Sequence, residues 1–200
     1  METSGRSDSA LAGTALLLID LQNETLHPRG GLAGDFPQMS GPLLDAVGSL
    51  IDWARAQEVP VIWARLAFRP GHFDAVQNSM SRRLGTFLDG QWGSQILEEL
   101  DPRPEDVMVT KRRPSAFFDT DLEIVLRGLD IRRLIVGGVS THWAVESTVR
   151  DGHSRDYEMV VVRQAVASPF AEFHEPSLRA MASVFASVVD LDAVINSSRS

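Results

Sequence analysis

Apolar residues recur along the chain in runs that have the length of β-strands. Six such runs lie at residues 14–19, 60–66, 107–110, 134–139, 159–162 and 184–189. The apolar residues are nearly continuous within each run, a pattern typical of strands buried on both faces in a parallel sheet. The pattern therefore predicts a central parallel sheet of six strands.

Amphipathic stretches of helical length separate these runs and cover residues 42–57, 121–128, 141–153 and 175–182. Pro42 and Pro176 lie near two of the predicted helix starts, where a proline costs little because the first N–H groups have no helical partner. Strands that alternate with helices are typical of right-handed crossovers. We therefore expect a three-layer α/β domain, with the six-stranded sheet flanked by helices.

The connection over residues 68–106 is much longer than most loops of a compact domain. It is rich in glycine and arginine, with Gly71, Gly85, Gly90 and Gly93 beside Arg69, Arg82, Arg83 and Arg103. A connection of this length is often a lid or a binding loop. A plain surface excursion with a short helix at residues 94–100 is the alternative.

Size and composition are those of one globular domain. The chain has 200 residues, of which 44% are hydrophobic, and we expect a single domain at residues 13–196 between tails at 1–12 and 197–200. A formal charge of −8 argues against nucleic-acid and anionic-membrane partners. No apolar run approaches the roughly 20 residues of a membrane helix, and the polar start does not resemble a secretory signal. A cytoplasmic location is expected.

Polar side chains directly follow two of the predicted strands. Asp20 ends the first apolar run, where burial raises the pKa of a carboxyl and favours proton transfer; a turn or helix cap is the alternative. Lys111 follows the third run. Paired with Asp20, it would hold that carboxylate ionised and stabilise a developing oxyanion; alone, it would be an ordinary surface lysine. Arg112 and Arg113 form either a solvated turn or an anion clamp.

The turn after the fourth run contains Gly137 and Gly138, which allow a tight backbone turn into a helix with free amides. Such amides bind anions or stabilise an oxyanion. The chain has no Gly-x-Ser-x-Gly motif around Ser140 and no Gly-x-Gly-x-x-Gly after the first strand, which disfavours a serine hydrolase and a dinucleotide site. The histidines are scattered and the chain has no cysteine, so we expect no metal site and no cofactor.

Taken together, these segments resemble the isochorismatase-like hydrolase superfamily, also called the cysteine hydrolases. The matching segments are ALLLIDLQ at 15–22, VTK at 109–111, SAFFDTDL at 115–122, GVSTHWAVEST at 138–148 and RDG at 150–152. In this order and spacing they are specific and cover nearly the whole chain. The resemblance implies a parallel sheet with helices on both faces, homodimers or larger homo-oligomers, and a cis peptide near Val139-Ser140.

Most members of this superfamily are amidases or ureidases with an Asp-Lys-Cys triad. By resemblance, Asp20 is the general base, Lys111 the positioning cation and position 144 the nucleophile. The resemblance also implies an oxyanion hole of backbone amides near position 144, for which we consider Val139, Ser140 and Trp143.

Position 144 holds an alanine, which cannot attack a carbonyl, so the covalent route is closed in the chain as written. Three explanations stay open. True isochorismatases resemble this family without the cysteine, and hydrolyse an enol ether by protonation from the Asp and addition of water; His142 favours this reading, because those enzymes carry a His where amidases usually carry Asn. An amidase inactivated by mutation is favoured by residues 145–152, which look like the ureidoacrylate amidohydrolase branch. The third explanation is a homologue that binds ligands without catalysis.

We therefore predict a hydrolase without a catalytic thiol, acting on a small anionic or cyclic metabolite with Asp20 as general acid. The expected substrate contacts are Gln22, Arg82, Arg83, Phe117 and His142. The two arginines suit a substrate carboxylate, because a guanidinium binds a carboxylate in bidentate fashion.

Overall fold

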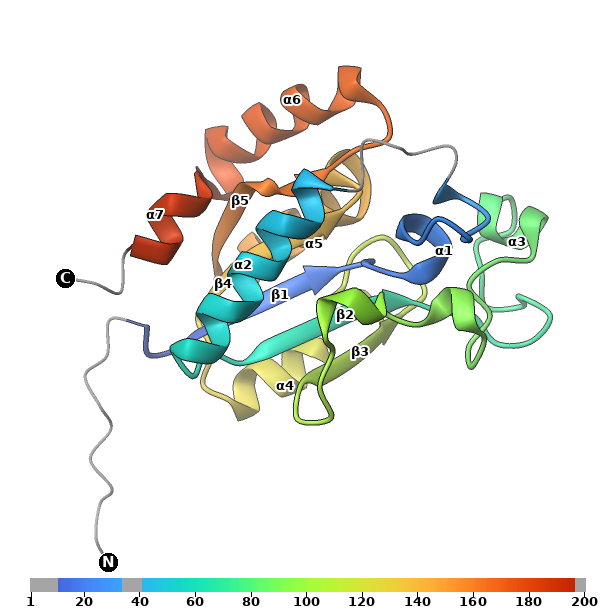
Figure 1. The fold of residues 1–200 in the computed structure, drawn as a ribbon, viewed down its shortest axis with the longest axis horizontal. Helices are drawn as coiled ribbons and strands as arrows, with labels where there is room; N and C mark the ends of the chain where they lie inside the picture. Colours follow the sequence, from blue (N-terminus) through green and yellow to red (C-terminus); the bar gives the residue numbers. More distant parts are fainter. Residues whose placement is uncertain (1–10, 34–40, 197–200) are drawn as a thin grey trace, which may run out of the picture.

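A parallel sheet of six strands forms the centre of the computed structural model, which describes residues 11–33 and 41–196 (Figure 1). The strands are β1 (Thr14–Ile19), β2 (Val61–Leu66), β3 (Val107–Lys111), β4 (Arg133–Val139), β5 (Glu158–Ala167) and β6 (Ser187–Val189). They lie in the order β3-β2-β1-β4-β5-β6, with every neighbouring pair parallel. The predicted fold class is confirmed.

Helices cover both faces of the sheet (Figure 1). They are α1 (Asn23–Leu26), α2 (Pro42–Ala56), α3 (Met80–Leu84), α4 (Leu122–Gly128), α5 (Glu146–His153), α6 (Ala171–Ala180) and α7 (Leu191–Asn196). Side chains of β1 alternate between the faces: Leu16 and Leu18 pack in the core with α2 and α7, whereas Leu17 and Ile19 pack with α4, α5 and α6. Because both sets are buried, the continuous apolar run of β1 follows from its central position.

The predicted bounds of β1 to β4, α2 and α4 agree with the structure to within one residue, whereas the last third of the chain differs more. The predicted helix 175–182 begins too late, because α6 starts at Ala171 and contains Pro176 in its interior. The predicted strand 184–189 is too long, since a π-helical turn at Met181–Phe185 precedes β6. The predicted strand 159–162 is too short, because β5 continues to Ala167.

An interior proline usually costs a helix about 3 kcal/mol, which is why Pro176 suggested a helix start. The residues that follow it, Ser177 and Leu178, are buried. The hydroxyl of Ser177 also donates to the backbone carbonyl of Thr141 at 3.3 Å. Packing of this turn against the neighbouring segment therefore offsets the missing N–H of the proline.

The strand order reverses at β1: β2 and β3 lie on one side of β1, and β4 to β6 lie on the other side. The switch point of the sheet is therefore between β1 and β4. Open α/β sheets usually bind ligands at such a switch point, at the carboxyl ends of the strands. Ile19 pairs with Gly138 there. Gly138 has φ +124°, and a Cβ at this position would overlap the backbone of Ile19, so the close approach of β1 and β4 requires glycine.

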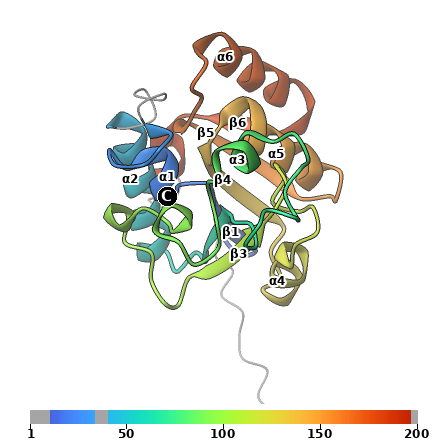
Figure 2. The ribbon, with the colours of Figure 1, turned by 90° about the vertical axis from the view of Figure 1, so that its right-hand side faces the viewer.

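The long connection after β2 lies beyond the carboxyl ends of the strands, and Figure 2 shows α3 in front of the sheet when the molecule is viewed from that side. Three of its residues, Phe68, Ala75 and Phe87, form a small core together with Leu32, which follows α1. The helix predicted at 94–100 is present only in part, as a 3₁₀ turn at Glu98–Leu100 that follows another at Trp92–Ser94.

The predicted tails at 1–12 and 197–200 fall, apart from residues 11 and 12, outside the described residues. Within the described ranges, no helix is long and apolar enough to cross a membrane.

Candidate active site

A buried ion pair joins the ends of β1 and β3. Nζ of Lys111 lies 2.7 Å from Oδ2 of Asp20, and only 1% of the lysine side chain and 15% of the aspartate side chain are exposed. Lys111 ends β3 and Asp20 directly follows β1, so the lysine side chain spans the end of the intervening strand β2. The structure therefore brings together the two residues that the strand ends suggested.

The surroundings of Asp20 change the pKa of its carboxyl group. Burial raises its pKa, and the charge and hydrogen bond of Lys111 offset this only in part. Oδ1, the oxygen that does not face Lys111, is buried and has no hydrogen-bond partner among the described residues. The backbone of Asp20 has φ +54° and its amide donates to the carbonyl of Ala64 at 2.8 Å, so the side chain leaves the strand at a sharp turn. A free carboxyl oxygen with a raised pKa is what a general acid or base needs.

Arg112 and Arg113 are neither a solvated turn nor a free anion clamp. Nε of Arg112 donates to the Asp74 carboxylate at 2.7 Å, and Nη1 of Arg113 donates to the Asp74 carbonyl at 2.8 Å. Asp74 lies in the long connection and was not identified from the sequence. The sequence offered one indication of Asp74, namely that it lies in the connection rich in glycine and arginine.

The turn after β4 brings its residues to the same switch point. The Val139-Ser140 peptide is cis, as the resemblance implied. A π-helical turn follows at Thr141–Val145, and the Trp143 amide donates to the Ser140 carbonyl at 3.0 Å. That amide is engaged in this hydrogen bond, and the oxyanion role expected for Trp143 stays a prediction. The oxyanion roles of Val139 and Ser140 stay predictions.

Ala144 is a small buried residue of this turn, 5% exposed, in the same core cluster as Ile19. Its carbonyl accepts a hydrogen bond from Oγ1 of Thr148 at 2.7 Å, and the same hydroxyl accepts from the Ala116 amide at 3.0 Å. Thr148 thus links position 144 to the segment that follows Lys111.

Two of the expected substrate contacts have structural partners instead. Gln22 is fully buried; its Nε2 donates to the carbonyls of Leu66 and Ser94, both at 2.8 Å, and its Oε1 accepts from the Leu66 amide at 2.9 Å. Phe117 is a core residue that packs against Tyr157 at 5.6 Å between ring centroids. The geometry gives both residues a structural role, and their contact with substrate stays a prediction.

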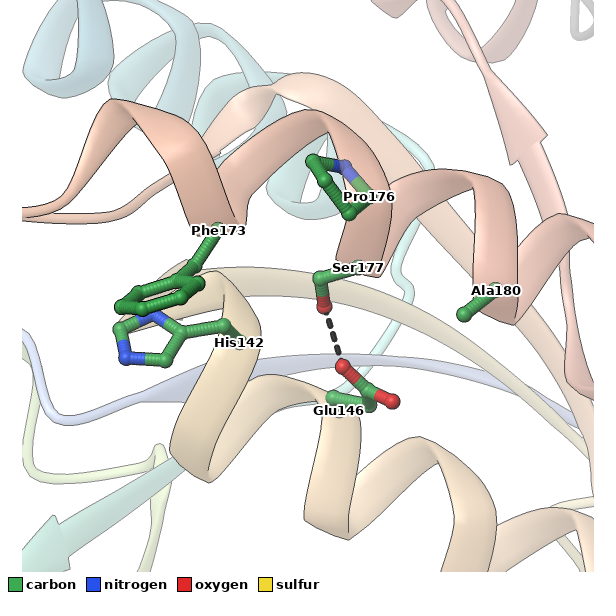
Figure 3. Close-up of a pocket in the computed structure, with 6 residues that line it drawn as sticks. All are labelled: His142, Glu146, Phe173, Pro176, Ser177 and Ala180. Atoms are coloured by element: carbon green, nitrogen blue, oxygen red, sulfur yellow. Dashed lines mark hydrogen bonds between the residues drawn. The ribbon is translucent and has the colours of Figure 1, made fainter.

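His142 faces α6, where it lines a surface cavity of about 370 Å³ with Glu146, Phe173, Pro176, Ser177 and Ala180 (Figure 3). Its ring packs on Phe173 at 5.2 Å, and its Nδ1 is hydrogen-bonded to the hydroxyl of Ser168 at 2.8 Å. Burial lowers the pKa of His142, so its ring is neutral at physiological pH. These contacts orient the ring toward α6, and its contact with substrate stays a prediction.

Arg82 and Arg83 lie on the short helix α3, which Figure 1 shows beyond the carboxyl ends of the strands. Within the part of the chain that the structure describes, neither guanidinium has an ion-pair partner. The described residues include no group of three or more His, Asp or Glu arranged to hold a metal ion.

A doubly wound sheet with a buried carboxylate–ammonium pair at its switch point defines an α/β enzyme domain. The Isochorismatase domain family matches residues 14–193, and the chain belongs to this family. It is therefore a hydrolase of the isochorismatase-like fold, as the sequence motifs indicated.

Individual relatives share about a third of their residues with this chain over the aligned length. The chain is 30% identical over 203 residues to the ureidoacrylate amidohydrolase RutB of Methylorubrum extorquens strain AM1, covering 90% of this chain and 80% of the relative. It is 33% identical over 178 residues to RutB of Pseudomonas syringae pv. syringae, with 80% and 73% covered.

Solved structures show the same fold. A cysteine hydrolase from Pseudomonas syringae pv. phaseolicola superposes with a TM-score of 0.81 at 27% identity, covering 98% of this chain and 97% of that one. An N-carbamoylsarcosine amidase from Thermoplasma acidophilum has a TM-score of 0.74 at 24% identity, with 90% and 96% covered. The second likeness shows the fold alone.

Proposed function

We propose that this chain hydrolyses a small metabolite without a thiol nucleophile, with Asp20 as the general acid and base and Lys111 as its partner. The observation that carries this proposal is the buried pair itself: a carboxyl with a raised pKa, held 2.7 Å from the ammonium of Lys111. Ala144 offers no nucleophile, so water must attack the substrate directly.

An enol ether suits such a site. Asp20 gives its proton to the double-bond carbon, water adds to the resulting oxocarbenium carbon, and the hemiketal collapses with release of the alcohol. Lys111 then stabilises the carboxylate that proton donation leaves behind. General acid catalysis contributes about 10²–10⁴-fold, which suffices for an enol ether or a strained ring but not for an unactivated amide.

A carboxylate on the substrate fits the charges near this edge of the sheet. Arg82 and Arg83 supply two guanidinium groups without ion-pair partners in the described structure, and arginine binds carboxylates in bidentate fashion. The substrate class proposed is therefore a small anionic or cyclic metabolite.

A second candidate is a cysteine-dependent amidase or ureidase whose nucleophile is replaced by Ala144. The 30% identity to a ureidoacrylate amidohydrolase over most of both chains favours it. Restoring the thiol separates the candidates, because Ala144→Cys creates amide hydrolysis only on an amidase scaffold.

The test is turnover by mass spectrometry on a mixed panel of enol ethers, cyclic hydrates, carboxamides and ureides. Hydrolysis by the parent chain supports the thiol-free mechanism. Amide or ureide hydrolysis by Ala144→Cys alone supports the silenced amidase. If neither protein turns over any substrate of the panel but ligand binding is retained, the result supports a non-catalytic homologue.

We also propose that the chain forms a homodimer or larger homo-oligomer and acts in the cytoplasm. The family resemblance supports the first expectation, and the composition supports the second. Light scattering coupled to size-exclusion chromatography measures the oligomeric state directly, and a monomer at micromolar concentration would contradict the first expectation.

A further inference from the structure

The ammonium of Lys111 has a second acceptor besides Asp20. Its Nζ donates to Asp20 Oδ2 at 2.7 Å and to the backbone carbonyl of Arg113 at 3.2 Å. The chain directly after β3 therefore folds back over its own lysine. The position of the Arg113 carbonyl therefore helps to fix the position of Lys111 Nζ.

Asp74 makes two hydrogen bonds to this turn. Its carboxylate accepts from Nε of Arg112 at 2.7 Å, and its backbone carbonyl accepts from Nη1 of Arg113 at 2.8 Å. The same Nη1 donates to the carbonyl of Arg112 at 2.7 Å, which tightens the turn further. One residue of the long connection thus binds both arginines that follow the lysine.

Asp74 is itself well fixed. Its side chain is 10% exposed, and its Oδ1 accepts from the backbone amide of Arg69 at 3.1 Å. Burial raises the pKa of the Asp74 carboxyl, but hydrogen bonds from Arg112 and the Arg69 amide outweigh burial and leave the pKa below its ordinary value. The group is therefore charged at neutral pH, and hydrogen bonds to a charged group are about twice as strong as neutral ones.

We propose that Asp74 is a positioning residue of the Asp20–Lys111 pair, acting through Arg112 and Arg113. A continuous series of contacts leads from Asp74 through the 112–113 turn to Nζ of Lys111 and on to Asp20. Asp74 lies in the same connection as α3, the helix that carries Arg82 and Arg83. The inference rests on the proposed function only in taking the pair as the reacting groups.

A single side-chain signal reports on this pair without any substrate. Lys111 is the only lysine of the chain, so biosynthetic labelling with ¹³C,¹⁵N-lysine gives one side-chain ammonium resonance. Asp74→Asn removes the charge and keeps the shape of the side chain. We expect it to displace the Lys111 signal and to speed exchange of the ammonium protons with water by about tenfold, because losing one charge-assisted hydrogen bond raises the open population by that order.

Two further variants serve as the negative and the positive control of this experiment. Asp89→Asn is the matched control, because it breaks the 2.8 Å Arg65–Asp89 ion pair in the same connection, and it should leave the Lys111 signal as in the parent. Asp20→Asn removes the direct partner of Lys111 and should change the signal.

A change in Asp20→Asn with none in Asp74→Asn overturns the positioning role of Asp74. No change in Asp20→Asn overturns the pair itself, and with it the proposed function. Should Asp74→Asn fail to fold, Arg112→Gln cuts the same hydrogen bond from the other side, and a Lys111 signal equal to that of Asp89→Asn then overturns the proposal.

Discussion

Nζ of Lys111 lies 2.7 Å from Oδ2 of Asp20, although the two residues are 91 positions apart in the sequence. The contact exists because β1 and β3 end at the same edge of one parallel sheet, with only β2 between them. Both side chains are withdrawn from water there, which couples the ionisation of the aspartate to the stability of the fold.

Removing one partner of this pair should destabilise the fold unequally. Asp20→Asn leaves the Lys111 ammonium buried without a counter-ion, which costs about 3–5 kcal/mol. Lys111→Met leaves a carboxyl whose pKa burial already raises, so Asp20 takes up a proton and the loss is smaller. Urea unfolding of both variants measures the difference, and equal losses would contradict it.

The stability of Lys111→Met should depend on pH with a definite sign. Burial holds the folded-state pKa of Asp20 above its ordinary value of 3.8, and Lys111 no longer offsets that effect. Between the unfolded and folded pKa values the folded state binds more protons, so stability falls as pH rises through this window. Unfolding free energies that increase with pH over the same window would show that Asp20 is not desolvated.

The pH dependence of the rate should separate the two catalytic mechanisms. A thiol-free reaction needs the protonated Asp20 carboxyl, so kcat/KM falls as pH rises through its raised pKa. Amide hydrolysis by Ala144→Cys needs the thiolate, so its rate rises with pH until the thiol is ionised. A parent profile that rises with pH like that of a thiol enzyme would exclude Asp20 as the proton donor.

Gly138→Ala should disrupt the switch point. The position has φ +124°, and a Cβ there overlaps backbone atoms of Ile19, so β1 and β4 must separate. We expect a loss of about 3 kcal/mol or more in unfolding free energy. Gly48→Ala, in α2 with nothing within 4 Å of the added Cβ, is the control and should gain about 0.5–1 kcal/mol. Similar effects at both glycines would refute the steric explanation.

Gln22→Leu should cost stability rather than substrate affinity. The change leaves the Leu66 amide and carbonyl without their partner, at about 1–3 kcal/mol for each buried group, and removes one of the two side-chain hydrogen bonds to the Ser94 carbonyl. Gln95→Leu, at an exposed side chain nearby, is the matched control. The unfolding free energy from chemical denaturation and the KM are measured for both variants. An unchanged unfolding free energy with a raised KM in Gln22→Leu would show that Gln22 contacts substrate.

The sequence identified Asp20 and Lys111 because each directly follows a buried strand, and parallel strands bring such residues to one edge. It placed the Val139-Ser140 cis peptide by family resemblance. It did not identify Asp74, whose partners are set by how a long connection folds over the sheet and not by any local pattern. The sequence also could not predict the hydrogen bonds of Gln22 and His142, because their partners are residues far away in the sequence.

Turnover in ¹⁸O-labelled water tests the thiol-free role of Asp20 most directly, with the parent chain, Asp20→Asn and Ala144→Cys compared on an enol ether and a ureide. The mechanism predicts that the parent hydrolyses the enol ether with one solvent oxygen in the product, and that Asp20→Asn lowers this rate by about 10²–10⁴-fold. No product from the parent, with ureide hydrolysis by Ala144→Cys alone, would contradict it.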